Sequence, residues 1–280
     1  MNNTRPGLAQ YTVLALLAIV FLYPIWWALS SSFKPAAEII TSPLSIGELT
    51  LGNYRAMFAD VPIGTGFANT ALVLLVKGAM TMFFAPLAGY AFAKYDFPFK
   101  NLLFGTVLLT LMLPTLVLII PLLLEMSALG WVNTYQALIL PGSIDAFSIF
   151  WMRQTIAAIP NELIDAGRVD GAGEFGIFAK VVLPVIRPGL AALAVLTTMN
   201  VYNDFVWPVV AVNDTSHQTL QVVLSTLAQN VTGNRIGADF ATVWGELLAA
   251  GSIAMLPLLV IFVLLQRHFI NGILAGSVKG

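Results

Sequence analysis

The chain has 280 residues, of which 58% are hydrophobic and only 10% are charged, and its formal net charge is −1. Soluble domains carry about 25% charged residues, so this composition argues against a soluble fold. The near-zero net charge also argues against a nucleic-acid partner. The absence of cysteine excludes disulfides, thiolate metal sites and cysteine nucleophiles. The two histidines, His217 and His268, lie far apart in sequence without a nearby second ligand, so no metal site is expected.

Several apolar segments are long enough to cross a hydrocarbon layer of about 30 Å as helices. We therefore predict an all-α integral membrane protein with about six transmembrane helices. The predicted spans are 11–31, 67–93, 101–124, 134–156, 187–212 and 247–266. The first span follows a single basic residue, Arg5, and is expected to remain uncleaved. The alternative is a signal peptide that is cleaved near Ala28 or Ser30.

The distribution of basic residues predicts how these spans are oriented. If the six spans start inside the cell, nine basic residues face the cytoplasm and three face outward, which fits the retention of positive charge in cytoplasmic loops. The inner residues are Arg5, Lys94, Lys100, Arg153, Arg168, Lys180, Arg187, Arg267 and Lys279, and the outer ones are Lys34, Arg55 and Arg235. Both termini are therefore expected in the cytoplasm. The external segments 34–66 and 213–240 are too small to be domains and are expected to be docking loops at most.

The longest predicted cytoplasmic segment, 159–184, has the features of a docking surface. Pro160 suits the first turn of a helix, and Glu162 places negative charge near the positive end of the helix dipole. Gly167 and Gly171 lie four residues apart, which on one helical face would let another backbone approach closely. Because charged residues surround this small-residue pattern, we expect the partner to be a water-soluble protein.

This segment resembles the EAA loop of importer-type ATP-binding-cassette (ABC) permeases, whose pattern is Glu-Ala-Ala, then Asp-Gly-Ala, then a hydrophobic-Leu-Pro ending. The chain departs from that pattern with Asp165 in place of Glu and Gly167 in place of the second Ala, both slightly helix-weakening. Other segments resemble maltose-transporter-type carbohydrate permeases, and the smaller six-span subunit in particular. The matching segments are 89–94, Leu113-Pro114, Leu129-Gly130, 165–167, 170–172, 182–184, 203–208 and 275–280.

The resemblance implies a single permease domain over residues 1–280 that forms half of a pore for a carbohydrate or related polar solute. It also implies a second permease, two cytoplasmic ATPase subunits and an external solute-binding protein that docks near 213–240. The chain has no phosphate-binding loop, so no cofactor is expected on it, and ATP and magnesium would be used by the ATPase. By resemblance, the residues that couple to the ATPase are Glu162, Asp165, Ala166, Gly167, Asp170 and Gly171. The tail 277–280 is expected to approach the ATPase pair.

Charged residues within the predicted spans are candidates for the solute pathway, because charge at mid-membrane costs on the order of 2.5 to 3.5 kcal/mol. Lys77 and Asp145 each lie about ten residues from the external start of their spans, or about 15 Å deep, so we predict that they pair. The pair either binds solute or only joins two spans. Asn203, Asp204 and Trp207 combine hydrogen-bonding groups with an aromatic face, and either contact a sugar or bond between spans.

An ion-coupled secondary transporter of small polar solutes is the main alternative, since intramembrane charges and proline-interrupted helices also occur in that class. The EAA-like loop argues against it. A membrane-embedded enzyme is a weaker alternative, because no clustered histidine or carboxylate motif with hydrolytic spacing occurs in a predicted span. The sequence leaves open which sugar or polyol is carried and whether this chain contacts it.

Overall fold

The computed structural model describes residues 7–45, 47–233 and 240–277, and these residues form helices without β-strands, as the composition predicts. The basic residues Arg5, Arg235 and Lys279, which entered the orientation argument, lie outside the described residues. The chain divides into two compact units. The first comprises residues 1–63 and 223–257, and the second comprises residues 64–222 and 258–280.

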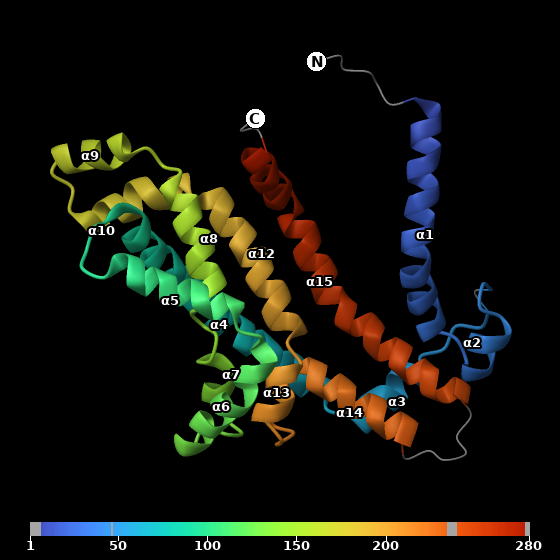
Figure 1. The fold of residues 1–280 in the computed structure, drawn as a ribbon. Coiled ribbons are helices and arrows are strands. Elements are labelled where there is room, and N and C mark those ends of the chain that lie inside the picture. The colour runs from blue at the N-terminus through green and yellow to red at the C-terminus, as the bar shows by residue number, and fades with distance from the viewer. Residues whose placement is uncertain (1–6, 46, 234–239, 278–280) are drawn as a thin grey trace. The chain divides into compact units, whose positions relative to one another are not determined.

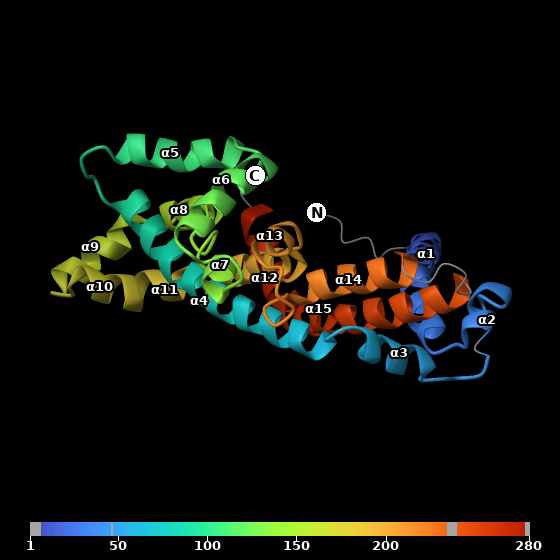
Figure 2. The same ribbon diagram turned by 90° about the horizontal axis from the view of Figure 1, so that it is seen from below.

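The first unit contains α1 (Leu8–Ser32), α2 (Ala36–Thr41), α3 (Gly52–Asp60) and parts of α14 (Leu220–Gly233) and α15 (Phe240–Ser277). The side-chain amide of Asn53 joins α3 to the end of α1, because it donates to the backbone carbonyls of Ser32 and Lys34 at 2.9 Å each. Lys34 is fully buried and donates to the carbonyls of Ser42 and Pro43. Within this unit α3 runs beside the first part of α15 (Figure 2).

The second unit holds most of the remaining helices. They are α4 (Ile63–Lys94), α5 (Lys100–Met112), α6 (Thr115–Ala128), α7 (Tyr135–Ile139), α8 (Ala146–Ala157), α9 (Asn161–Val169), α10 (Glu174–Ile177), the π-helical turn η1 (Phe178–Val182), α11 (Leu183–Val185), α12 (Arg187–Asn203) and α13 (Val206–Ala211). One apolar core, around Met152, Ile164 and Ile177, packs near α9 and α10. A second core, around Val73, Leu138 and Trp207, packs near α7 and α13. Figure 1 shows these two groups of short helices at opposite ends of the unit.

The first, second and sixth predicted spans overlap single long helices, whereas the third, fourth and fifth do not. Among the described residues, three helical segments are long and apolar enough to cross a membrane: Leu8–Ser32, Ile63–Lys94 and Val243–Ile261. Two further pairs of helices pass the same test only together, and they bend by 107° between α5 and α6 and by 78° between 174–185 and α12. Up to five spans result if each bent pair is one span. The count of six stays a prediction.

The segments predicted as the third, fourth and fifth spans are not continuous helices, and proline explains much of this. Leu113 has an extended backbone because it precedes Pro114, and α5 therefore ends there. Residues 140–145 interrupt the fourth segment between α7 and α8; this stretch contains Pro141 and Gly142, whose φ of 71° is left-handed. In the fifth segment α12 ends at Asn203 and α13 begins only at Val206.

Candidate functional site

The predicted short helix of the EAA-like loop is present as α9. Pro160 precedes its first residue, and Ile164 is buried in the core of the second unit while Glu162, Asp165 and Ala166 are exposed. Exposed apolar side chains accompany these polar groups: Val169 is 87% exposed, and Phe175 at the start of α10 is 68% exposed. The helix is thus anchored on one side and presents a mixed polar and apolar surface on the other.

The structure contradicts the expectation that Gly167 and Gly171 share a helical face. The helix ends at Val169, and Gly171 lies beyond it with a left-handed φ of 77°. The amide of Gly171 donates to the Arg168 carbonyl and the amide of Ala172 donates to the Gly167 carbonyl, which is the Schellman arrangement of a helix end. Gly171 is therefore required by the turn, because a side chain is disfavoured in this backbone region.

Gly167 serves packing within the chain. A Cβ atom at this position would lie 3.1 Å from a side-chain carbon of Ile177, so the missing side chain lets α9 approach η1 and α10 closely. The exposed surface of this segment consequently consists of other residues of α9, with Asp170 exposed at its C-terminal cap.

Polar groups at the C-terminal end of α4 hold the loop in place, and sequence reasoning did not assign them. The Lys94 ammonium donates to the Ile159 carbonyl at 2.5 Å and to Asn161 Oδ1 at 2.8 Å. The hydroxyls of Tyr90 and Tyr95 donate to the Glu174 carboxylate. Lys94 and Tyr90 lie within 89–94, a segment that carries the family resemblance, and that position was the available signal.

Arg168 completes this network from α9 itself. Its guanidinium donates to Glu174 Oε1 at 2.8 Å and to Asp165 Oδ1 at 3.0 Å, so Asp165 is partly engaged within its own helix. The bond from Arg168, followed by the bond from Tyr95, holds the pKa of Glu174 below its ordinary value of 4.5. Burial, followed by the bond to Glu174, raises the pKa of Tyr95. We call Tyr90, Lys94, Tyr95, Arg168 and Glu174 the loop clamp.

The lowered pKa of Glu174 predicts how the loop clamp depends on pH. A carboxylate with a depressed folded-state pKa contributes stability above its unfolded pKa and loses it as the pH falls through the folded pKa. We therefore expect the difference in unfolding midpoint between wild type and Glu174→Gln to be constant above about pH 5 and to shrink below it. Asp96→Asn, which changes a fully exposed carboxylate, is the control. A difference that does not vary with pH would contradict the assignment.

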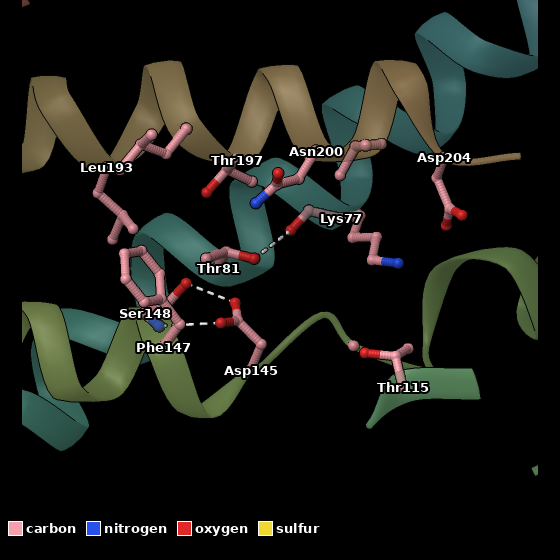
Figure 3. A pocket seen from close by; sticks show the side chains of 13 residues that line it. Lys77, Thr81, Thr115, Asp145, Phe147, Ser148, Leu193, Thr197, Asn200 and Asp204 are labelled. Carbon is pink, nitrogen blue, oxygen red and sulfur yellow. Dashed lines mark hydrogen bonds between the residues drawn. The ribbon is translucent and has the colours of Figure 1, made fainter. Parts of the chain in front are cut away.

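A cavity of about 370 Å³ in the second unit gathers three of the candidate pathway residues. Figure 3 shows Lys77 from α4, Asp145 from the start of α8 and Asp204 from the end of α12 around the same space. The other lining residues are Thr81, Thr115, Gly142, Phe147, Ser148, Leu193, Leu196, Thr197, Asn200 and Val201. The volume lies in the usual range of small-molecule sites, about 300 to 1,000 Å³.

Lys77 and Asp145 share this cavity, but no ion pair joins these two described residues. Asp145 caps α8 instead: one carboxylate oxygen accepts from the Ser148 backbone amide at 2.9 Å, and the other accepts from the Ser148 hydroxyl. The Lys77 ammonium lies beside the turn that precedes α8, since a methyl group at Gly142 would be 3.5 Å from Nζ. Asp204 lines the same cavity as Lys77 and Asp145. The predicted pair is thus a three-charge cluster.

The three candidate residues at the end of α12 and in α13 lie in different surroundings. Asp204 lines the cavity, whereas the exposed Asn203 donates to the Met199 carbonyl and does not line it. Trp207 donates its indole N–H to the Ala137 carbonyl at 2.8 Å and lines an adjoining, mostly apolar cavity of about 370 Å³. Sequence reasoning missed Thr197 and Asn200. Asn200 follows Thr197 by three residues and Asp204 follows it by seven. This spacing places the three residues on one helical face.

The segment after α13, which was predicted to be external, is fixed by hydrogen bonds to the rest of the second unit. The Asn133 side chain accepts from the amides of Asn213 and Asp214, and the Asn69 side chain donates to the carbonyls of Ser216 and Gln218. Residues 234–239 of the predicted docking segment, and 278–280 of the tail, lie outside the described residues.

Within the described part of the chain, no group of three or more histidine and carboxylate residues is arranged to hold a metal ion. His217 instead contacts the Tyr135 ring edge-on and bonds to Asp214. The side chain of His268 lies outside the described residues.

Comparisons with known proteins agree on one class of protein. The profile of the family "binding-protein-dependent transport system inner membrane component" matches residues 85–274. The chain is 35% identical to the arabinooligosaccharides transport system permease protein AraQ of Halalkalibacterium halodurans, over 95% of this chain and 94% of AraQ. It is 34% identical to the lactose transport system permease protein LacG of Rhizobium radiobacter, over 100% of this chain and 98% of LacG. With the sn-glycerol-3-phosphate transport system permease protein UgpE of Brucella abortus it shares 29%, over 98% of each.

Solved structures show the same fold. A chain of a bacterial ABC transporter involved in the import of the acidic polysaccharide alginate superposes with a TM-score of 0.79 and 21% identity, covering 94% of this chain and 96% of that one. A chain of a bacterial alginate ABC transporter in complex with an alginate pentasaccharide-bound periplasmic protein gives a TM-score of 0.60 and 16% identity, covering 92% of each.

Proposed function

This chain belongs to the family of binding-protein-dependent transport system inner membrane components, and from this premise we propose how it works as a permease component of a carbohydrate ABC importer. It pairs with a second permease to form the pore and takes solute from an extracytoplasmic binding protein. Two cytoplasmic ATPase subunits supply ATP and magnesium chemistry, because the chain has no phosphate-binding loop of its own. The family assignment supports this function over ion-coupled secondary transport.

The observation that carries the proposal is that α4 connects the two candidate sites. Its C-terminal end holds the EAA-like loop through Lys94, and its middle contributes Lys77 and Thr81 to the charged cavity. Lys94 follows Lys77 by 17 positions in α4, which corresponds to about 25 Å along the helix. A displacement of α9 by an ATPase would therefore be transmitted along α4 to the cavity, and ATP binding would shift the permease between two states.

The segment 213–218 of the second unit supports docking of a binding protein. The hydrogen bonds of Asn69 and Asn133 fix residues 213–218 in one conformation, so little conformational entropy would be lost when a partner binds there. With the EAA-like loop in the cytoplasm, this segment lies outside, and both termini are cytoplasmic.

The experiment that tests the coupling uses the exposed surface of α9. The tagged chain is extracted in mild detergent, and the co-purifying proteins are identified by mass spectrometry. We expect wild type to retain a second permease and an ATPase, and Val169→Glu to lose the ATPase at least tenfold while it keeps the permease. Val169 is 87% exposed, so this charge perturbs a partner contact without entering the core.

Two further variants make this experiment specific. Asp170→Lys reverses an exposed charge at the helix cap and should also weaken ATPase retention, whereas Asp96→Ser alters an exposed residue of the turn between α4 and α5 and should not. A large side chain at Gly167, as in Gly167→Trp, would not test ATPase binding, because it would disturb the packing against Ile177 within the chain. A chain that purifies alone and still moves solute in vesicles without ATP would refute the proposed function.

A further inference from the structure

We propose that the charged cavity admits neutral polyhydroxylated solutes and rejects anionic ones, with Asp145 and Asp204 as specificity-determining residues. The inference rests on the proposed function, because it concerns the solute that passes this cavity. Family membership leaves the charge of the solute open.

The ionisable residues that line the cavity give it an excess of negative charge. One lysine, Lys77, and two carboxylates, Asp145 and Asp204, are the ionisable side chains that line the cavity among the described residues. The adjoining cavity shares Lys77 and Asp204 and adds no other ionisable residue from the described part of the chain. A single ammonium group cannot neutralise two carboxylates, so an anionic solute meets an excess of negative charge in surroundings where charges are weakly screened.

The position of Asp145 keeps that excess in place. Its carboxylate accepts from the Ser148 backbone amide and hydroxyl at the N-terminus of α8, where the helix dipole favours negative charge. Figure 3 shows the Lys77 ammonium on the side of the cavity that Asp204 lines, with Asp145 set apart across the cavity. Asp145 thus remains an acceptor-only group that can bind a solute hydroxyl but repels a carboxylate or phosphate.

The uncharged lining suits hydroxyl groups. Thr115, Thr197 and Asn200 line the cavity, and their side chains form no hydrogen bond with the described part of the chain. These groups offer both donors and acceptors, which a polyhydroxylated molecule requires. Phe147 and Leu193 supply apolar surface beside them, as a sugar ring with polar edges and apolar faces needs.

This chain has no native cysteine, so a single engineered cysteine can be followed on this chain in the assembled importer. Asn200→Cys is modified with three methanethiosulfonate reagents, one neutral and glucosyl, one anionic and sulfonated, and one cationic. Each rate is divided by the rate with free cysteine. We expect the anionic reagent to react about fivefold more slowly than the cationic one, with the neutral reagent between them. In the Asp204→Asn background the rates should become equal, and in Asp145→Asn/Asp204→Asn the order should invert.

Thr197→Cys provides the same measurement from a second wall position if Asn200→Cys does not assemble. An anionic reagent that reacts as fast as the neutral one, or no reaction with any reagent at either position, would overturn the inference. Retention of the ATPase by the same preparation distinguishes failure of this inference from failure of the proposed function. If the ATPase co-purifies and charge discrimination is absent, only the inference fails; if no ATPase co-purifies, the proposed function fails.

Discussion

Lys77→Met is expected to lower solute uptake by at least tenfold and to reduce the amount of assembled permease several-fold. Among the described residues, this lysine is the only cationic side chain lining the cavity, and its removal leaves Asp145 and Asp204 without a compensating charge. Breaking a fully buried pair costs about 3 to 5 kcal/mol, and the cost here is smaller because Lys77 is half-buried. Uptake in membrane vesicles and the yield of the co-purified complex measure the two effects.

A second variant separates assembly from transport. Lys77→Met/Asp204→Asn removes one carboxylate together with the lysine, so we expect it to restore assembly while uptake per assembled complex stays low. Lys100→Met is the control away from the cavity. It removes a surface pair with Asp96, of at most about 1 kcal/mol, and a hydrogen bond to the Tyr95 carbonyl, but no charge that lines the cavity. Full uptake by the double variant would show that the charges only join helices. Wild-type behaviour of Lys77→Met would exclude any role for the cluster.

Gly89→Ala is expected to destabilise the permease strongly, although alanine favours helix. A Cβ atom at residue 89 of α4 would lie 2.7 Å from the Met152 Cβ and 2.8 Å from the backbone nitrogen of Arg153 in α8. Backbone atoms cannot move aside as a flexible side chain can, so α4 and α8 must separate. Overpacking of this kind costs about 1 to 3 kcal/mol. The unfolding midpoint in detergent should fall by several degrees.

The same helix supplies the control for this substitution. A Cβ atom added at Gly78 would have no neighbouring atom within 4 Å, so Gly78→Ala should be neutral or stabilising by up to about 1 kcal/mol through helix propensity. Because both glycines lie inside α4, propensity contributes equally and the difference between the variants reports the contact with α8. Equal midpoints for the two variants would show that α8 leaves room for a methyl group at residue 89.

The EAA-like loop shows how far a sequence motif can be interpreted. The motif identified the family correctly, and the helix that it predicts begins at Asn161, directly after Pro160. The motif did not separate two roles for its glycines. Gly171 makes a left-handed turn and Gly167 accommodates Ile177, and both roles depend on where α9 ends and what packs beneath it. An argument from spacing alone assumes that the helix continues through Gly171, whereas α9 ends at Val169.

The charged cavity shows the limit in a different way. Lys77, Asp145 and Asp204 were recognised because charge is rare in apolar segments, and the cavity brings all three together. Their arrangement was not predictable from depth along continuous helices, because Asp145 is a helix cap after the break at Pro141 and Gly142. Thr197 and Asn200 went unnoticed because uncharged polar residues are common in membrane helices and carry no signal until a cavity is known.

The sequence by itself determined the membrane environment, the helical class and the family, and it located the segment that is predicted to dock to a partner. These depend on composition and on local patterns, since backbone groups in lipid must be hydrogen-bonded, which favours helix in an apolar segment. Only the tertiary structure decided where helices break, which residues clamp the loop to α4, and which polar groups face one cavity. Those features depend on contacts between residues far apart in the chain, such as Lys94 with Ile159, which local patterns do not encode.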